Sequence, residues 1–390
     1  MNKEFFDQVH DRRTPGDIKY MPFEGVENLI PMWIADMDFK CPPSIAKAMK
    51  EAADREIFGY MAPDDEYYAA ITNWYDRRFN WHIEKDEVIP MPGVVFAIAT
   101  VIKALTEPGD KVLICEPVYY PFRGMIESNG RITEVSELKS NGRTHYEFDF
   151  EDLDQKLADD DVKLFILCSP HNPVSRVWTR EELLKIAHLC AKNNVPVVSD
   201  EIHSDLVYGG HNNTPFALVA DELRDNFVIC TAPTKTFNMA GIQASNVIAK
   251  NPELRKKINR AMEATGCFEP NWMGMAALKG AYNEGEEWLE ELLKYLEHNV
   301  EIVREELAKT DGKVKLVEPE GTYLLWLDCS ALNMDDKALD EFFVHKTGLR
   351  FDAGTMFGES GSGFTRMNIA CPEKTLREAL ERIVNAVKEL

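Results

Sequence analysis

The stretch Thr231-Ala-Pro-Thr-Lys235-Thr-Phe-Asn-Met-Ala-Gly-Ile-Gln-Ala-Ser-Asn246 holds a single lysine between two apolar runs. The runs, residues 227–230 and 246–249, are each typical of a short buried strand. Lys235 has no charged neighbour here, and burial disfavours the charged form of an amine. A neutral amine is the form that condenses with an aldehyde. A lysine that reaches solvent from a loop explains the stretch equally well, so the rest of the chain must decide.

Upstream of Lys235, short apolar runs alternate with helical patterns. The strand-like runs are residues 111–115, 163–168, 195–199 and 227–230. One helix is predicted over 180–193, because Thr179 can cap its first turn and Glu182 stands three residues further on. Strand, loop, helix and strand at this spacing predict an α/β fold, a three-layer α/β/α arrangement with a mostly parallel sheet.

Beyond about residue 285 the pattern changes. Residues 288–309 have the periodicity of a long amphipathic helix, and strands and helices follow without regular alternation. This α+β pattern is typical of a second, smaller domain. We therefore expect a large domain at residues 46–284 and a small domain built from residues 1–45 and 285–390.

Composition and charge exclude several classes of protein. The 390 residues include 66 acidic and 44 basic side chains, which give a net charge of −22. Such a surface repels phosphate backbones and anionic lipids, so we expect neither nucleic acid nor a membrane as partner. No apolar run is long enough to span a membrane, and the N-terminus lacks the apolar core of a signal peptide.

The eight cysteines lie far apart and form no C-x-x-C pair. The spacing therefore predicts neither a zinc site nor a disulfide framework, and we expect no metal. Free cysteines in this number are typical of a reducing compartment, most simply the cytoplasm.

Polar or aromatic side chains follow each predicted strand where it ends. In chain order these residues are Tyr119, Asn172, Asp200, His203 and Lys235. If the strands are parallel, the five side chains meet at one edge of the sheet, where open α/β sheets bind their ligands. The apolar helix that starts after Gly93 adds backbone N–H groups at Val94 and Val95, which suit an anion.

This set of groups matches the needs of pyridoxal phosphate. Its aldehyde needs an amine, which Lys235 supplies, and its pyridine nitrogen needs a carboxylate such as Asp200 to stay protonated. Asn172 and His203 can donate hydrogen bonds to the ring oxygen O3′, and Tyr119 can stack on the ring face. The phosphate can sit on the helix start described above. Each residue alone has an ordinary explanation as a cap, a turn or a core residue, so the prediction depends on their joint order.

Further motifs extend this pattern over almost the whole chain. They are Trp33-Ile-Ala-Asp-Met-Asp-Phe39, Phe58-Gly-Tyr60, Ser169-Pro-His-Asn-Pro173, Ser199-Asp-Glu-Ile-His203, Ala232-Pro-Thr-Lys-Thr-Phe-Asn238 and Gly363-Phe-Thr-Arg-Met-Asn-Ile-Ala-Cys371. With these motifs the sequence resembles the fold-type I pyridoxal-phosphate enzymes of the class I/II aminotransferase group. More narrowly, it resembles the MalY/PatB-type cystathionine β-lyase, or C–S lyase, branch. His203 and Gln243 favour this branch, because ordinary aminotransferases usually carry Tyr and a phosphate-binding Arg there.

The resemblance implies further roles in the site. Arg366 would hold the carboxylate of the substrate, a task that suits a forked guanidinium. Thr234 and Gln243 would contact the phosphate, and the loop from Trp33 to Asp36, which includes Ala35, would close over the substrate. Tyr60 would reach the phosphate in the neighbouring subunit, which implies a homodimer with shared active sites.

The chain departs from the family pattern at two positions. Thr234 stands where Ser is usual and keeps the hydroxyl, and Ser175 stands where Gly is usual. If a positive φ is required there, Ser175 introduces local strain. Neither change removes a catalytic group.

The resemblance implies a β-elimination that converts cystathionine or another S-substituted L-cysteine to a thiol, pyruvate and ammonia. In that reaction Lys235 removes the α-proton as general base. An aminotransferase that acts on an L-amino acid with the same cofactor is the first alternative, and His203 and Gln243 argue against it. The second is a regulatory or interaction protein that keeps the cofactor only as structure. The intact set of Lys235, Asp200, Asn172 and Arg366 argues against that.

Overall fold

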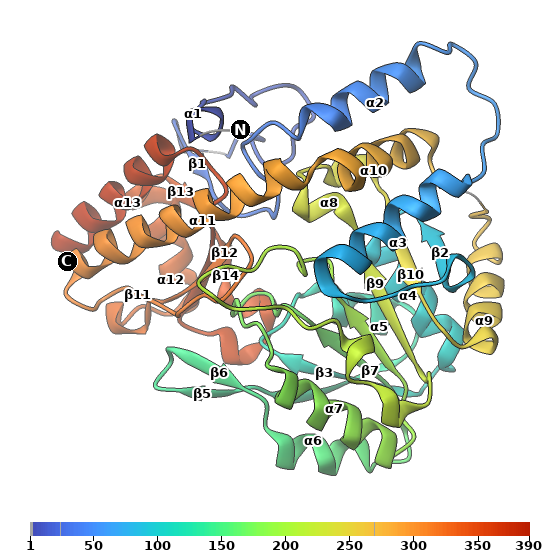
Figure 1. The fold of residues 1–390 in the computed structure, drawn as a ribbon. Coiled ribbons are helices and arrows are strands. Elements are labelled where there is room, and N and C mark those ends of the chain that lie inside the picture. Colours follow the sequence, from blue (N-terminus) through green and yellow to red (C-terminus); the bar gives the residue numbers. More distant parts are fainter. Residues whose placement is uncertain (1–2, 24, 269) are drawn as a thin grey trace.

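The computed structural model describes residues 3–23, 25–268 and 270–390, so residues 1, 2 and 24 of the predicted small domain and residue 269 of the predicted large domain lie outside it. Its centre is a seven-stranded sheet in the order β2-β10-β9-β8-β7-β3-β4 (Figure 1). The strands are β2 (Val88–Met91), β3 (Lys111–Glu116), β4 (Ile132–Glu137), β7 (Val162–Cys168), β8 (Val197–Asp200), β9 (Phe227–Thr231) and β10 (Ser245–Ile248). All neighbours pair in parallel except β10, which runs antiparallel to both β2 and β9. The predicted mostly parallel sheet is confirmed.

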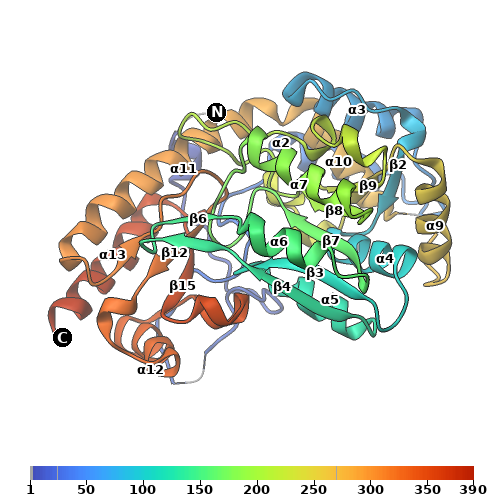
Figure 2. The ribbon, with the colours of Figure 1, turned by 90° about the horizontal axis from the view of Figure 1, so that it is seen from below.

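Helices cover both faces of this sheet because successive strand residues point to opposite sides. In β3, Val112 and Ile114 belong to one apolar cluster, and Leu113 and Cys115 belong to the other. The first cluster is covered by α4 (Val94–Leu105), α5 (Pro121–Ser128) and α9 (Pro252–Glu263). The second is covered by α3 (Asp65–Phe79), α6 (Phe150–Leu157), α7 (Arg180–Lys192) and α10 (Trp272–Glu284). Figures 1 and 2 show the resulting three layers, as predicted.

The start of α7 has the predicted cap. The Thr179 hydroxyl accepts a hydrogen bond from the backbone N–H of Glu182, and the Glu182 carboxylate accepts one from the backbone N–H of Thr179. Two otherwise unpaired donors of the first turn are thereby satisfied.

A second, smaller sheet has the strand order β11-β12-β15-β14. Its strands are β11 (Lys315–Leu316), β12 (Leu324–Asp328), β14 (Asp352–Ala353) and β15 (Phe364–Asn368). The long helices α11 (Glu286–Leu307) and α13 (Glu373–Lys388) pack beside it. Helix α12 (Asp336–Glu341) widens into a π-helical turn at Phe342–Thr347.

The N-terminal segment joins this C-terminal part. Strand β1 (Ile30–Pro31) pairs in parallel with β13 (Leu349–Arg350), and α1 (Lys3–Phe6) contacts α11 (Figure 1). Helix α2 (Pro43–Ala53) then crosses to α10. This arrangement agrees with a small domain made from both chain ends, although the boundaries at residues 45 and 285 stay a prediction.

The remaining elements are short. A hairpin is formed by β5 (Lys139–Asn141) and β6 (His145–Glu147), and α8 (Pro233–Thr236) is a single turn. The 3₁₀ turns are Lys85–Glu87, Phe216–Leu218, Asp221–Leu223, Ala240–Ile242, Ala308–Thr310, Ser330–Leu332, Gly354–Phe357 and Glu359–Gly361.

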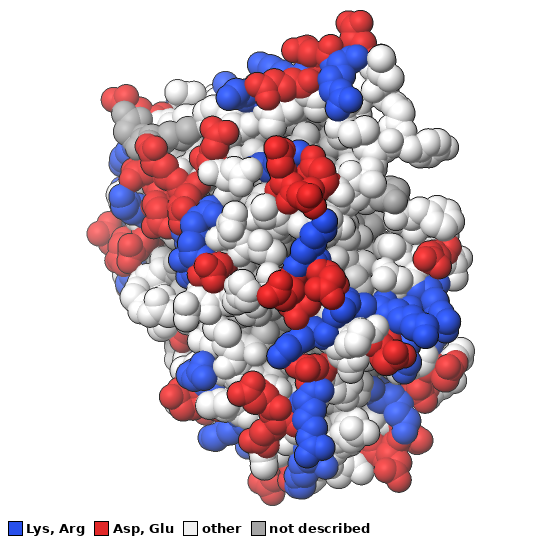
Figure 3. Space-filling view, turned by 45° about the vertical axis from the view of Figure 1, so that its right-hand side comes forward, with Lys and Arg blue, Asp and Glu red and all other residues white. Residues whose placement is uncertain are grey.

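Figure 3 shows acidic and basic side chains interspersed over one face of the molecule. Across the residues that the structure describes, no helix combines the length and the apolar character needed to cross a bilayer.

Candidate active site

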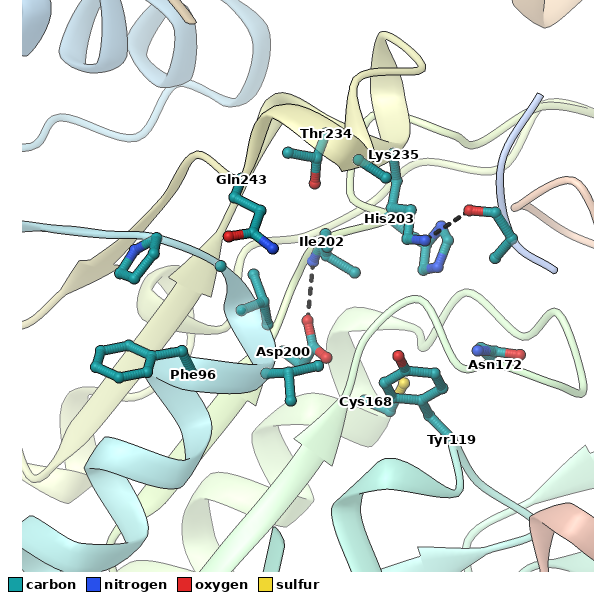
Figure 4. Close-up of a pocket in the computed structure, with 16 residues that line it drawn as sticks. Phe96, Tyr119, Cys168, Asn172, Asp200, Ile202, His203, Thr234, Lys235 and Gln243 are labelled. Atoms are coloured by element: carbon teal, nitrogen blue, oxygen red, sulfur yellow. Dashed lines mark hydrogen bonds between the residues drawn. The ribbon is translucent and has the colours of Figure 1, made fainter. Parts of the chain in front are cut away.

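A cavity of about 440 Å³ lies at the carboxyl ends of the parallel strands (Figure 4). Its lining includes ten residues that the sequence predicted for the site. They are Ala35, Val94, Val95, Tyr119, Asn172, Asp200, His203, Thr234, Lys235 and Gln243. The lining also contains Phe96, Cys168 and Ile202, which the sequence did not single out.

The strand directions explain why distant residues meet here. Asp200 ends β8 and Lys235 follows β9, and these two strands are parallel neighbours. Gln243 reaches the same edge by another route, because it precedes β10, and an antiparallel strand starts where its neighbours end. Val94 follows β2, which also ends at this edge.

Lys235 projects from the one-turn helix α8 into the cavity (Figure 4). Its Nζ donates a hydrogen bond of 2.6 Å to the carbonyl oxygen of Ala35. Desolvation lowers the pKa of this amine to about 8, and the positive charge of Arg366 adds to the effect. At pH 7 about a tenth of Lys235 is therefore neutral and nucleophilic, far more than for an amine of ordinary pKa.

Asp200 presents a carboxylate to the other side of the cavity. Burial raises its pKa to about 7, and a backbone hydrogen bond from Ile202, at 3.2 Å, and the charge of Lys235 oppose that rise only in part. A buried carboxylate with so little compensation favours a cationic partner.

His203 and Asn172 line the cavity beside these two charges. Burial lowers the pKa of His203 to about 3, so its ring is neutral, and its Nδ1 has no hydrogen-bond partner among the residues that the structure describes. Asn172 accepts a hydrogen bond of 3.0 Å from Arg366 through its side-chain oxygen. Tyr119 places its ring below Asp200 and Asn172 in the view of Figure 4.

The far end of the cavity suits an anion. Helix α4 begins at Val94 behind Gly93, and no side chain caps its first N–H groups. The Thr234 side chain and the Gln243 amide point toward the same space (Figure 4). A helix N-terminus with free N–H groups beside a hydroxyl and an amide is a common phosphate site.

Arg366 does not line the cavity itself, but its Nη1 donates the hydrogen bond to Asn172, which does. It is buried in β15, where it pairs across the strands with Asp352, and it forms an ion pair with the Asp352 carboxylate. Its Nη2 also donates to the carbonyl oxygen of Trp33 at 3.0 Å, and within the described part of the chain its Nε has no hydrogen-bond partner.

The segment 33–36 lies over Lys235, but its acidic side chain turns away. The Asp36 carboxylate forms ion pairs with Arg12, at 2.7 Å, and with Lys19, at 3.3 Å. Asp36 lines a separate surface hollow, and within this segment Ala35 is the residue that lines the cavity. Whether the segment moves over a substrate stays a prediction.

Three predicted site residues, Asp36, Arg366 and Tyr60, do not line the cavity, and Tyr60 lies furthest from the arrangement that the sequence predicts for a single chain. It lies in the loop between α2 and α3, and its side chain is fully exposed at 106%. Ile57 and Phe58 in the same loop are also largely exposed.

Three residues that the sequence reasoning missed support the site from behind. Asp352 pairs with Arg366, and the Tyr323 hydroxyl donates to the Ala35 carbonyl at 3.1 Å, the oxygen that also accepts from Lys235. Asn368 donates to the carbonyl oxygens of Ile34 and Asp36. Asn368 stands two residues after Arg366 in the motif at 363–371, and this position could have indicated its role. Asp352 and Tyr323 lie in no motif that the sequence analysis identified.

Ser175 adopts a φ of 57°, so the condition under which the sequence implied local strain is met at this non-glycine residue. Its buried hydroxyl donates to the carbonyl oxygen of Leu324 and so ties the loop after β7 to β12.

Known proteins resemble this chain over nearly its full length. The family model for aminotransferase class I and II matches residues 27–383. Cystathionine β-lyase PatB of Bacillus subtilis is 43% identical over 93% of this chain and 94% of its own. Cystalysin from Treponema denticola, whose crystal structure contains a pyridoxal 5′-phosphate cofactor, has a TM-score of 0.95 at 37% identity and 98% coverage of both chains.

A third comparison agrees. The pyridoxal-phosphate-bound C–S lyase from Staphylococcus hominis has a TM-score of 0.92 at 31% identity, and the match covers 98% of this chain and 97% of the other. The resemblance drawn from the motifs is thereby confirmed. The chain belongs to the aminotransferase class I and II family.

Proposed function

We propose that this protein is a pyridoxal-phosphate-dependent carbon–sulfur β-lyase. It would cleave cystathionine or another S-substituted L-cysteine, with one water, to a thiol, pyruvate and ammonia. The observation that carries the proposal is the meeting of the low-pKa amine of Lys235 and the poorly compensated carboxylate of Asp200 in one cavity. The 43% sequence identity between this chain and a protein named cystathionine β-lyase supports the choice of reaction.

The residues of the cavity fit the cofactor. The buried Asp200 carboxylate lacks a cationic partner, and a protonated pyridine nitrogen would supply one. The unpaired Nδ1 of His203 and the uncapped start of α4 are polar groups left without a partner. They are the groups that a ring oxygen and a phosphate would satisfy.

Each group of the cofactor then has a proposed holder. Lys235 would bind the aldehyde carbon, Asp200 the pyridine nitrogen, and Asn172 with His203 the ring oxygen. The phosphate would lie against the N–H groups of Val94 and Val95, the Thr234 hydroxyl and the Gln243 amide, and Tyr119 would cover the ring. When bound, the cofactor supplies an aromatic ring that accepts the electron pair left at the substrate's Cα.

The chain's own residues then bind the substrate and move its proton. The guanidinium of Arg366 would hold the α-carboxylate through its free Nε–H, while Asp352 and Asn172 fix its orientation. The neutral amine of Lys235 would take the α-proton, because its pKa of about 8 lets it act as a base near neutral pH. The segment 33–36 lies over Lys235 and would shield the reacting atoms from water.

A pyruvate assay tests the reaction. The purified protein with bound pyridoxal phosphate is incubated with L-cystathionine and with a panel of S-substituted cysteines, without any 2-oxo acid. We expect pyruvate, thiol and ammonia in equal amounts. Lys235→Ala removes this activity, whereas Lys294→Ala, at an exposed lysine of α11, retains it. Turnover that appears only when a 2-oxo acid is added would show an aminotransferase instead.

We also propose that the protein acts as a homodimer with shared active sites. Ile57, Phe58 and Tyr60 are exposed at 78%, 66% and 106%, which is unusual for three large side chains in one loop. A second copy of this chain would cover them, and the Tyr60 hydroxyl would then reach the phosphate end of the partner's cavity.

A further inference from the structure

The loop after β8 holds a buried carboxylate that the proposed reaction does not use. Asp205 is 3% exposed and does not line the cavity. Its Oδ1 accepts a hydrogen bond from the indole N–H of Trp74, at 3.2 Å, and lies 3.2 Å from the Nε of Arg78. Its Oδ2 accepts a hydrogen bond of 3.0 Å from the hydroxyl of Thr236.

These contacts join the two segments that form the core of the site. Asp205 stands two residues after His203, in the loop that begins at Asp200. Thr236 is fully buried and directly follows Lys235 in α8. The carboxylate therefore links the segment that faces the pyridine nitrogen to the segment that carries the amine.

Helix α8 needs such a link. It is a single turn of four residues, and its N-cap, Ala232, has no side chain that can cap it. One helical turn is unstable by itself, because it fixes several dihedral angles for a single hydrogen bond. The direction in which Lys235 leaves the turn must therefore be set by tertiary contacts.

A carboxylate suits this position better than an amide. Donors approach both of its oxygens, with Trp74 and Arg78 at one and Thr236 at the other. An asparagine would be neutral and would remove the negative charge that faces the guanidinium of Arg78. Arg78 offsets the buried charge and is itself bound to Glu286 and Glu290 on α11.

We propose that Asp205 and Thr236 form a positioning pair that holds the amine of Lys235 in register with Asp200 and His203. The proposal rests on the proposed function of this cavity. A misplacement of about 1 Å can lower a rate by about a hundredfold, because proton transfer requires close alignment. Binding of the substrate carboxylate depends on Arg366, in the other sheet, so loss of the pair should lower kcat and leave KM nearly unchanged.

Thr236→Val tests the pair, because it keeps the shape of the side chain and removes the hydroxyl. We expect kcat to fall about tenfold or more, in line with such misplacement, and the dissociation constant of pyridoxal phosphate, measured by absorbance titration, to rise. Thr236→Ser restores the hydroxyl and should return both quantities to within about twofold of wild type. The matched control is Thr310→Val, which removes an equally buried, hydrogen-bonded hydroxyl at the far end of α11 and should change neither quantity.

Three outcomes would overturn the proposal. They are a Val variant that binds the cofactor and turns over like wild type, a Ser variant as impaired as the Val variant, and an equal loss in Thr310→Val. The free energy of unfolding of each holoenzyme shows whether a defect merely follows lost stability. The cofactor titration does not depend on the reaction, so it still decides the proposal if wild type itself forms no pyruvate and the lyase assignment fails.

Discussion

Lys235 owes its low pKa to two influences of different kind. The first is desolvation by the surrounding protein, and the second is the positive charge of Arg366. Asp36 and Asp200 act in the opposite direction, because negative charges favour the protonated amine. The effect of the Arg366 charge can be tested by itself, because a substitution at Arg366 removes that charge and changes no residue that lines the cavity.

Arg366→Gln should raise the pKa of Lys235 from about 8 toward the ordinary value of 10.5. Loss of a neighbouring cation stabilises the protonated form of the amine, so the neutral fraction of Lys235 falls at any pH between these values. Competitive acetylation of the cofactor-free protein with acetic anhydride from pH 6 to 11, read by peptide mass spectrometry, gives the midpoint directly. Lys235 keeps surface toward the cavity, so the reagent can reach it.

Arg382→Gln, on α13, is the control for this measurement, and its midpoint should equal that of wild type. A wild-type midpoint near 10.5 would contradict a cavity that activates the amine. A midpoint unchanged in Arg366→Gln would show that desolvation alone sets the value.

Among the elements, the central parallel strands were predictable and several others were not. The runs at 112–115, 164–168 and 227–230 are continuously apolar, because both of their faces are buried, and such runs are readily recognised. Edge strand β4 has a mixed pattern, with Ile132 half exposed, and gives no comparable signal. Helix α10 packs so closely on α2 that a Cβ on Gly280 would meet the Ser44 carbonyl oxygen at 2.8 Å. Its small buried residues hide the helical periodicity.

The residues of the site also differ in how far the sequence could predict them. The residues that follow parallel strands could be placed from local sequence, because parallel strands end at one edge. Gln243 could be placed only by resemblance, since no sequence pattern shows that β10 runs antiparallel. The supporting pairs, Asp352 with Arg366 and Asp205 with Thr236, bring together distant segments, and nothing local in the sequence predicts such contacts.

The segment 33–39 is held by side chains from distant parts of the chain, and Asn238 makes three of these hydrogen bonds. The Asn238 amide accepts from the backbone N–H of Met37 and donates to the carbonyl oxygens of Met37 and Phe39. Asn238 also adopts a φ of 52°, which asparagine and glycine tolerate better than alanine.

Asn238→Gly should destabilise the protein by about 2–3 kcal/mol, because three hydrogen bonds of about 1 kcal/mol each are lost. Asn238→Ala should lower the free energy of unfolding by about 1 kcal/mol more, because the left-handed backbone conformation is unfavourable for alanine. Denaturant unfolding at saturating cofactor and one fixed protein concentration measures both values.

Asn333 provides the matched control, since it has a φ of 54° and is exposed on the surface. Asn333→Gly should leave the free energy of unfolding nearly unchanged, and Asn333→Ala should lower it by about 1 kcal/mol. Equal costs of Gly substitution at both positions would mean that the Asn238 amide does not hold the segment.

At the scale of the whole molecule, the exposed loop with Ile57, Phe58 and Tyr60 is the feature that a single chain does not explain. A monomer gains nothing from large apolar side chains in water. In a symmetric dimer, each chain would give Tyr60 to its partner and receive one in return. Each cavity would then contain Lys235 of one chain and Tyr60 of the other, and this division of labour can be tested by mixing variants.

Tyr60→Ala and Lys235→Ala should each be impaired alone and should restore activity together. After random re-association, half of the dimers are mixed, and one site in each has both residues, so about one quarter of wild-type activity should return. The control is a mixture of Lys235→Ala with Arg366→Gln. These residues belong to the same chain's cavity, so its mixed dimers hold no intact site. If the Tyr60→Ala mixture gave only the sum of its separate activities, Tyr60 would act within its own chain, and the shared site would be wrong.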